Sequence, residues 1–118
     1  MKWEIKIGSI VIDCYEFDRM LAFWQETLHY EPREPAKGGW VVLRDPTGRN
    51  PNISLNGVPE KHSGRNWLHF DLYTNNRKEE VKRLLEIGAT LHPQEYEPDE
   101  DFRVLKDTDG NLFCVVQK

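Results

Sequence analysis

The chain has 118 residues, of which 31% are charged and 38% apolar, and its formal net charge is −4. This composition predicts one globular domain and excludes a disordered chain. The sequence holds no apolar run of about 20 residues and no basic stripe, so we expect no membrane span and no nucleic-acid partner. Its start, "MKWEIKIGS", lacks the apolar core of a signal peptide, and we expect a cytoplasmic protein.

The first part of the chain predicts a strand, a helix and two further strands. The strand covers 6–15, and the helix covers 17–30 with an apolar stripe at Met20, Leu21, Trp24 and Leu28. Short strands follow at 39–45 and 51–57, joined by a Pro/Thr/Gly turn.

The same order then returns. A strand is predicted at 66–74 and a helix at 76–88, with Asn75 or Asn76 as its N-cap and Gly88 at its end. The remaining strands are expected at 89–93, 102–107 and 111–117, and a tight Asp-Gly turn joins the last two. In the first half, "HYEPRE" at 29–34 takes the place of the strand at 89–93.

These two series form a repeat, because "LRDPTGRNPNISL" (43–55) is echoed by "LKDTDGNLFCVV" (105–116). Superposing "IVID" (10–13) on "LHFD" (68–71) aligns both helices and both turns within a few residues. We therefore predict one α+β domain, 1–118, made of two βαβββ modules at about 6–57 and 66–117 with the linker 58–65. Each module is too small to bury its apolar face alone, so the two modules should pack on each other.

Strand alternation assigns the side chains to faces. Leu68, Phe70 and Leu72 should face the second helix, while Trp67, His69, Asp71 and Tyr73 face away from it. In the first strand, Ser9, Val11 and Asp13 lie opposite Ile10, Ile12 and Cys14. The polar faces should form the concave side of a cupped mixed sheet, which is the usual setting of a small-molecule site.

The sequence resembles the vicinal oxygen chelate superfamily, and more closely its glyoxalase-like, bleomycin-resistance-type two-module proteins. The likeness rests on "IDCYEFDRMLAFWQETLHYEP", "GWVVLRDPTGRNPNISL", "HFDLYTNNRKEEVKRLLEIGATL" and "VLKDTDGNLFCVV", which cover nearly the whole chain. It implies a glyoxalase/bleomycin resistance/dihydroxybiphenyl dioxygenase fold and a homodimer. The superfamily includes glyoxalases, dioxygenases, epimerases, thiol transferases and metal-free proteins that sequester antibiotics.

Metal-using members of this superfamily hold a divalent ion with His and Glu from the first and last strand of each module. At the matching positions this chain has His69, Ser9 (or Val11 after a small slip), Ser54 and Cys114. A catalytic metal site needs about three protein ligands, so we expect no standard metal centre and no cofactor. Both cysteines are expected to be free thiols.

Three hypotheses follow. The first is a metal-independent protein that binds a small organic molecule, with an aromatic or heterocyclic part, in the concave sheet. The second is a lyase or isomerase in which His69, with Asp13 or Asp71, moves a proton. The third is a divalent-metal enzyme with unconventional ligands that include His69 and Cys114. The candidate ligand-binding residues are Trp67, Tyr73, Trp40, Ser54, Asn56, Arg44, Cys114 and Ser9.

Overall fold

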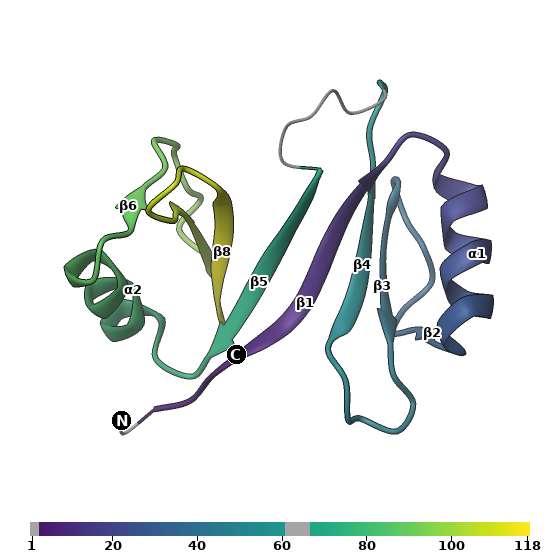
Figure 1. Ribbon diagram of the computed structural model, residues 1–118, viewed down its shortest axis with the longest axis horizontal. Coiled ribbons are helices and arrows are strands. Elements are labelled where there is room, and N and C mark those ends of the chain that lie inside the picture. The colour runs from purple at the N-terminus through teal and green to yellow at the C-terminus, as the bar shows by residue number, and fades with distance from the viewer. Residues whose placement is uncertain (1–2, 61–66) are drawn as a thin grey trace. The chain divides into compact units, whose positions relative to one another are not determined.

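The computed structural model describes residues 3–60 and 67–118, so residues 61–65 of the predicted linker and residue 66 of the predicted strand lie outside the described residues. The elements follow the order βαβββ-βαβββ (Figure 1). They are β1 (Ile5–Cys14), α1 (Phe17–Leu28), β2 (Glu31–Pro32), β3 (Trp40–Arg44), β4 (Asn52–Gly57), β5 (Leu68–Thr74), α2 (Arg77–Glu86), β6 (Thr90–Leu91), β7 (Phe102–Lys106) and β8 (Leu112–Gln117). The α+β class and the repeated order are confirmed.

Two compact units make up the chain. The N-terminal unit is Ser9–Leu68, and the C-terminal unit joins the residues up to Gly8 with His69–Lys118. Strand β1 therefore begins in the C-terminal unit and ends in the N-terminal one. The two units use the same strand arrangement: β2-β3-β4-β1 in the first and β5-β8-β7-β6 in the second. In each, the first strand pairs in parallel with the last, and the remaining pairs are antiparallel.

The N-terminal unit buries one face of its sheet under α1 (Figure 1). The buried cluster consists of Ile12, Cys14, Val41, Leu43 and Leu55. Phe17, Met20, Leu21 and Trp24 of the helix are partly buried and pack against it, and Trp24 does so from the apolar stripe on which the sequence places it. The predicted face alternation of β1, with Ile12 and Cys14 on the helix side, therefore holds in this unit.

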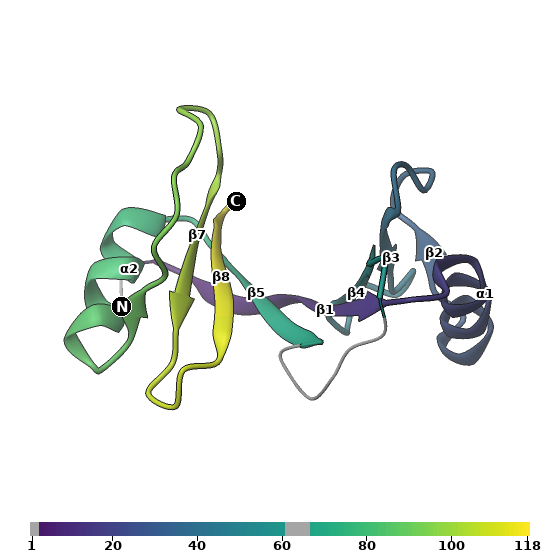
Figure 2. The same ribbon diagram turned by 90° about the horizontal axis from the view of Figure 1, so that it is seen from above.

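In the C-terminal unit, α2 packs on β8 (Figures 1 and 2). The helix begins where the sequence predicts, because the side chain of Asn76 accepts a hydrogen bond from the backbone N–H of Glu79. Leu105 and Val115 are fully buried in this half. Leu68 and Phe70, which were expected to lie under the helix, are instead 41% and 44% exposed. The reason is that α2 has only 10 residues and covers β8 rather than the start of β5.

The two Asp-Gly turns have the same internal structure. Asp45 accepts hydrogen bonds from the backbone N–H groups of Thr47 and Asn50, and Asp107 accepts them from those of Asp109 and Asn111. The bonds from Thr47, followed by those from Asn50, hold the pKa of Asp45 at about 2. The pKa of Asp107 is lowered in the same way, chiefly by Asn111. The echo in the sequence is thus a repeated carboxylate-stabilised turn.

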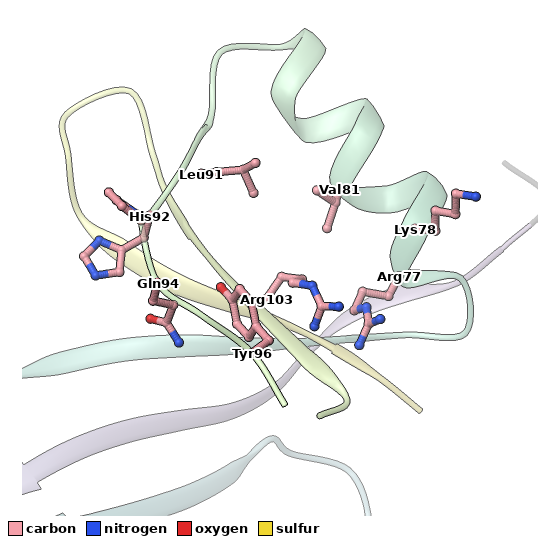
Figure 3. Close-up of a pocket in the computed structure, with 9 residues that line it drawn as sticks. Arg77, Lys78, Val81, Leu91, His92, Gln94, Tyr96 and Arg103 are labelled. Atoms are coloured by element: carbon pink, nitrogen blue, oxygen red, sulfur yellow. The ribbon is translucent and has the colours of Figure 1, made fainter. Parts of the chain in front are cut away.

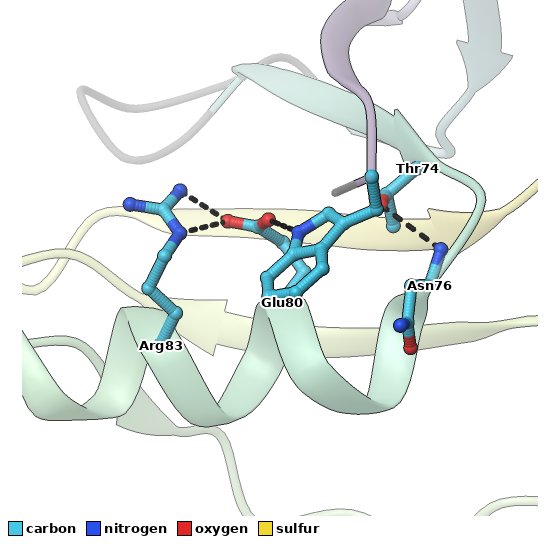
Figure 4. Close-up of polar contacts among 5 residues, drawn as sticks. Thr74, Asn76, Glu80 and Arg83 are labelled. Atoms are coloured by element: carbon cyan, nitrogen blue, oxygen red, sulfur yellow. Dashed lines mark hydrogen bonds and ion pairs between the residues drawn. The ribbon is translucent and has the colours of Figure 1, made fainter. Parts of the chain in front are cut away.

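A buried carboxylate fixes the start of the chain to α2. Glu80 is fully buried, and it accepts hydrogen bonds from the indole of Trp3 and the guanidinium of Arg83 (Figure 4). At the beginning of the same helix, the hydroxyl of Thr74 accepts a hydrogen bond from the backbone N–H of Asn76. None of the described helices has the length and apolar character that a membrane crossing needs.

Candidate functional site

Three predicted site residues meet on the polar face of the C-terminal unit. His69 and Asp71 lie two residues apart on β5 and therefore share a face. Cys114 lies opposite Asp71 in the parallel pairing of β5 with β8. One potential ligand atom from each of the three lies within 4.8 Å of the others.

The contacts in this group are polar but only partly screened from solvent. The Nε2 atom of His69 is 3.6 Å from Oδ1 of Asp71, and the two side chains are 25% and 17% exposed. This distance is too long for a strong hydrogen bond, but it allows an ion pair when the imidazole is protonated. The group can therefore present an imidazole and a carboxylate together to a ligand.

The Cys114 side chain is held as a neutral thiol. Burial raises its pKa to about 12, and the negative charge of Asp71 and a hydrogen bond to that carboxylate add to the shift. A thiol with this pKa is a poor nucleophile at neutral pH, because the thiolate is the reactive form. In the absence of a metal, Cys114 is suited to donating a hydrogen bond rather than to covalent chemistry.

Tyr73, further along β5, packs against the chain itself. A Cβ atom built on Gly8 would overlap the Tyr73 ring, so the ring covers a position that only glycine can occupy without a shift. The ammonium of Lys118 lies 4.8 Å from the centre of the same ring. These contacts give Tyr73 a packing role in addition to the predicted contact with a ligand.

The polar face of the N-terminal unit carries a different set of groups. The hydroxyls of Ser9 and Ser54 are hydrogen-bonded to each other at 2.6 Å, and both residues are buried. The Asp13 carboxylate accepts a hydrogen bond of 3.1 Å from the amide of Asn56. The contact between Ser9 and Ser54 joins two neutral groups, and the contact between Asn56 and Asp13 stabilises a carboxylate.

The hairpins align the two halves of the repeat. Asp45 and Asp107 open the equivalent turns between the last two strands of each half. The residue three positions before each Asp is paired with Ser54 in the first half and with Cys114 in the second. Ser54 is therefore the structural counterpart of Cys114.

The parallel pairings extend this alignment to the first strands. Val11 lies opposite Ser54, and Asp71 lies opposite Cys114, the counterpart of Ser54. Two positions earlier on the same faces come Ser9 and His69. Ser9, rather than Val11, is thus the counterpart of His69, and the superposition of "IVID" on "LHFD" is displaced by two residues. Asp13, which we expected to be equivalent to Asp71, corresponds to Tyr73.

The resemblance implies a divalent metal centre with ligands from both halves, and the equivalent positions show whether the residues fit it. Where the C-terminal unit has His69 and Cys114, the N-terminal unit has two buried serines bonded to each other. Neutral hydroxyls are poor ligands beside imidazole, thiolate or carboxylate. A four-ligand centre drawn equally from both halves does not fit these residues. Among the described residues, the group of His69, Asp71 and Cys114 offers the ligand set.

The remaining predicted residues are placed at the surface of the N-terminal unit. Trp40 is 41% exposed and lines a pocket of about 240 Å³ together with Arg33, Glu34 and Lys37. Arg44 forms an ion pair with Glu31 of the neighbouring strand, so its charge is already matched. Trp67 is 41% exposed, and its carbonyl accepts the backbone N–H of Asp13 at 2.7 Å.

The sequence reasoning missed two features near α2. One is the burial of Glu80, because a glutamate on a helix normally indicates the solvent-facing side. The other is a basic pocket that is lined by Arg77 and Arg103 among other residues. The two arginines are 26 positions apart in a chain with many charges, so no local signal indicates that they line one cavity.

Comparisons with known proteins agree with this architecture. A family model described as a glyoxalase-like domain matches residues 9–116. No curated protein is significantly similar to the chain.

Several solved structures are similar to it. A glyoxalase/bleomycin resistance protein/dioxygenase superfamily member from Vibrio splendidus 12B01 has a TM-score of 0.64 at 16% identity, covering 99% of this chain and 100% of that one. Methylmalonyl-CoA epimerase from Mycobacterium tuberculosis has a TM-score of 0.62 at 15% identity, covering 93% and 85%. A single-residue variant of the Streptomyces coelicolor epimerase, in complex with 2-nitronate-propionyl-CoA, has a TM-score of 0.65 at 16% identity, covering 96% of each chain. At these identities the likeness establishes the fold.

Proposed function

The chain belongs to the glyoxalase-like domain family, and from this membership we propose that it is a metal-independent protein that binds a small organic molecule. The ligand would be held on the polar faces of the sheet strands, with His69, Asp71 and Cys114 as its polar contacts. The ligand would carry an aromatic or heterocyclic part. The cytoplasm as its location and a homodimer as its assembly remain predictions.

One observation carries the metal-independent part of this proposal. The Ser9 and Ser54 hydroxyls, the counterparts of His69 and Cys114, are neutral, buried groups that are hydrogen-bonded to each other at 2.6 Å. The N-terminal unit therefore lacks a charged or imidazole ligand at the positions that the repeat makes equivalent. The polar group in the C-terminal unit retains a carboxylate, an imidazole and a thiol, which can recognise a ligand by hydrogen bonds without a metal.

Ligand screening tests the binding function. We expect a polar aromatic compound to raise the melting temperature of the wild-type protein, and His69→Ala to weaken its binding by about tenfold or more. His29→Asn is the matched control, since His29 is an exposed residue at the end of α1 with a backbone φ of 57° that asparagine also tolerates. Equal loss of binding in both variants would refute a role for the His69 group.

The same variant separates a binding protein from an enzyme. A lyase or isomerase that uses His69 with Asp71 as a base would keep its ligand affinity in His69→Ala but lose turnover. A binding protein would show a loss of affinity and no turnover in either form. The variant Asp13→Asn tests whether Asp13 takes part in proton transfer, because it keeps an acceptor for the amide of Asn56 but removes the charge.

A second candidate function rests on the three clustered ligand atoms. His69, Asp71 and Cys114 could hold one divalent ion such as Zn²⁺, which accepts nitrogen, oxygen and sulfur ligands and needs three of them in an open site. The ion would act as a Lewis acid there. A stoichiometric metal found by elemental analysis of protein purified without chelator, lost in Cys114→Ser but retained in Cys14→Ser, would establish this candidate and refute metal independence.

A further inference from the structure

A second cavity lies in the C-terminal unit, apart from the His69 group. It has a volume of about 570 Å³ and opens between α2, β6, the segment after β6, and β7 (Figure 3). The residues that line it include Arg77, Lys78, Val81, Leu91, Tyr96 and Arg103. None of them belongs to the polar group of His69, Asp71 and Cys114. The volume falls within the range of known small-molecule sites, about 300 to 1,000 Å³.

Part of the cavity lining is apolar. Val81 of α2 and Leu91 of β6 face each other across it (Figure 3). Leu91 is 54% exposed, although it lies on a strand next to β7. An exposed leucine opposite a valine leaves apolar surface that a ligand with an apolar body would cover.

Two arginine side chains, those of Arg77 and Arg103, line this cavity (Figure 3). The Arg77 guanidinium donates to the carbonyl of Glu100 at 3.0 Å, and that of Arg103 donates to the carbonyl of Phe102 at 2.6 Å. The Arg103 guanidinium also lies 4.4 Å above the ring of Tyr96. Each arginine is thus held in place by a neutral partner.

Among the described residues, no carboxylate lies within ion-pair distance of either arginine. Within residues 3–60 and 67–118, neither Arg77 nor Arg103 forms an ion pair, even though the acidic stretch 95–101 is close in sequence to both the cavity wall and β7. A guanidinium has five N–H donors, and one bond to a carbonyl leaves most of them available. Paired guanidinium donors suit the two oxygens of a carboxylate.

We propose that this cavity is a second ligand site, which takes a small organic carboxylate with an apolar body. The carboxylate would lie against Arg77 and Arg103, and the apolar body would lie between Val81 and Leu91. Lys78, whose side chain is at the edge of the cavity, adds positive charge without defining the geometry (Figure 3). This site is separate from the one in the proposed function and does not depend on it.

The first experiment compares three probes on the uniformly ¹⁵N-labelled wild-type chain by NMR titration. The probe 3-phenylpropionate should bind in the millimolar range, as expected for about a dozen non-hydrogen atoms. It should shift backbone amides in α2, β6 and β7. The neutral analogue 3-phenylpropanamide should bind at least about fivefold more weakly, because it cannot form charge-assisted bonds. Inorganic phosphate should also bind at least about fivefold more weakly, because it lacks the apolar body.

The second experiment uses variants of the same chain. Arg103→Gln and Arg77→Gln should each weaken 3-phenylpropionate binding by at least about fivefold, and Arg103→Lys should have an intermediate effect because it keeps the charge but not the fork. Lys82→Gln is the matched control: it removes a positive charge from a position on α2 that does not line the cavity, and binding should change by less than about twofold. Thermal unfolding verifies that each variant is folded.

Several results would overturn the proposal, and the comparison of probes needs no variant to fold. These results are equal binding of the acid and its amide, binding of phosphate as tight as that of the acid, amide shifts confined to the His69 group, or no shift up to the solubility limit of 3-phenylpropionate. Unchanged affinity in both arginine variants would also overturn it. If His69→Ala no longer binds the ligand of the His69 group but binds 3-phenylpropionate normally, the two sites are independent.

Discussion

Cys114 lies opposite Asp71 in the parallel pairing of β5 with β8, and the Asp71 carboxylate adds to the burial that raises the pKa of the Cys114 thiol. The counterparts of these two residues in the other half of the repeat are Ser54 and Val11. The repeat therefore preserves the backbone arrangement while it places a polar, titratable pair in one half only. This asymmetry is the reason to look for the ligand-binding residues in the C-terminal unit.

The first prediction concerns the reactivity of Cys114. A thiol with a pKa of about 12 is a thiolate in only about 10⁻⁴ of molecules at pH 8, so native Cys114 should react with iodoacetamide far more slowly than a free cysteine. Asp71→Asn removes the negative charge, lowers the pKa and should speed alkylation severalfold. Mass spectrometry on a Cys14→Ser background measures the rate. Fast alkylation of Cys114 with Asp71 intact would contradict the assigned environment.

The second prediction is a pH dependence at the first turn. The pKa of Asp45 is about 2 in the folded protein, against an ordinary value of 3.8, so its ionised form stabilises the fold above about pH 4. This stability is lost as pH falls from about 4 towards 2. Asp45→Asn should lower the melting temperature at pH 7, and its difference from wild type should shrink across that window.

Asp107→Asn serves as the comparison for the turn. Asp107 occupies the equivalent position, and its pKa is also lowered, but it is exposed whereas Asp45 is buried. We expect a pH dependence of the same sign and smaller size. A difference between wild type and Asp45→Asn that stays constant from pH 7 to pH 2 would show that the ionised carboxylate is not what stabilises the turn.

The third prediction tests the packing of Tyr73. Gly8→Ala would place a methyl group where the Tyr73 ring already lies, so the ring or the strand must move. Overpacking of this kind costs about 1 to 3 kcal/mol in the free energy of unfolding. Gly57→Ala is the matched control, since the nearest atom to its added Cβ is 3.5 Å away. Chemical denaturation measures both variants, and a similar effect in the two would refute the steric explanation.

The fourth prediction concerns the attachment of the chain start to α2. Trp3→Phe removes the indole N–H that donates to the fully buried Glu80 carboxylate, which should lower the free energy of unfolding by about 1 to 3 kcal/mol. The effect of Trp3→Phe should be smaller on a Glu80→Gln background. Arg19→Gln breaks an exposed ion pair with Glu16 and should cost less than about 1 kcal/mol. If the exposed pair proved the more costly to remove, the proposed role of Glu80 would be wrong.

Much of the fold was predictable because its causes are local in sequence. Asn76 begins α2 by accepting a hydrogen bond from a residue three positions on, and Asp45 and Asp107 organise their turns by bonds to N–H groups two to five positions on. Trp24 packs against the buried cluster because helical periodicity puts it on the apolar stripe of α1. Signals between residues a few positions apart can be identified in the sequence alone, and their recurrence revealed the repeat.

In the second half, the burial of residues between the helix and the sheet was predicted less well. Phe70 was expected beneath α2 but is 44% exposed, and Glu80, a charged residue of α2, is fully buried. Periodicity gives the face on which a residue lies, but the length and position of the neighbouring element decide whether that face is covered. Trp3, far away in the sequence, supplies the partner that makes burial of Glu80 tolerable.

The sequence by itself determined the class of fold, the repeated modules, and the sharing of one strand face by His69 and Asp71, because alternation and turn chemistry depend on neighbouring residues. Only the tertiary structure decided that Cys114 stands opposite Asp71, that Ser9 and Ser54 bond to each other, and that Arg77 and Arg103 line one cavity. Each of these relationships depends on the register between strands or on the packing of a helix against them. Those are set by the summed burial of many side chains rather than by any short stretch of sequence.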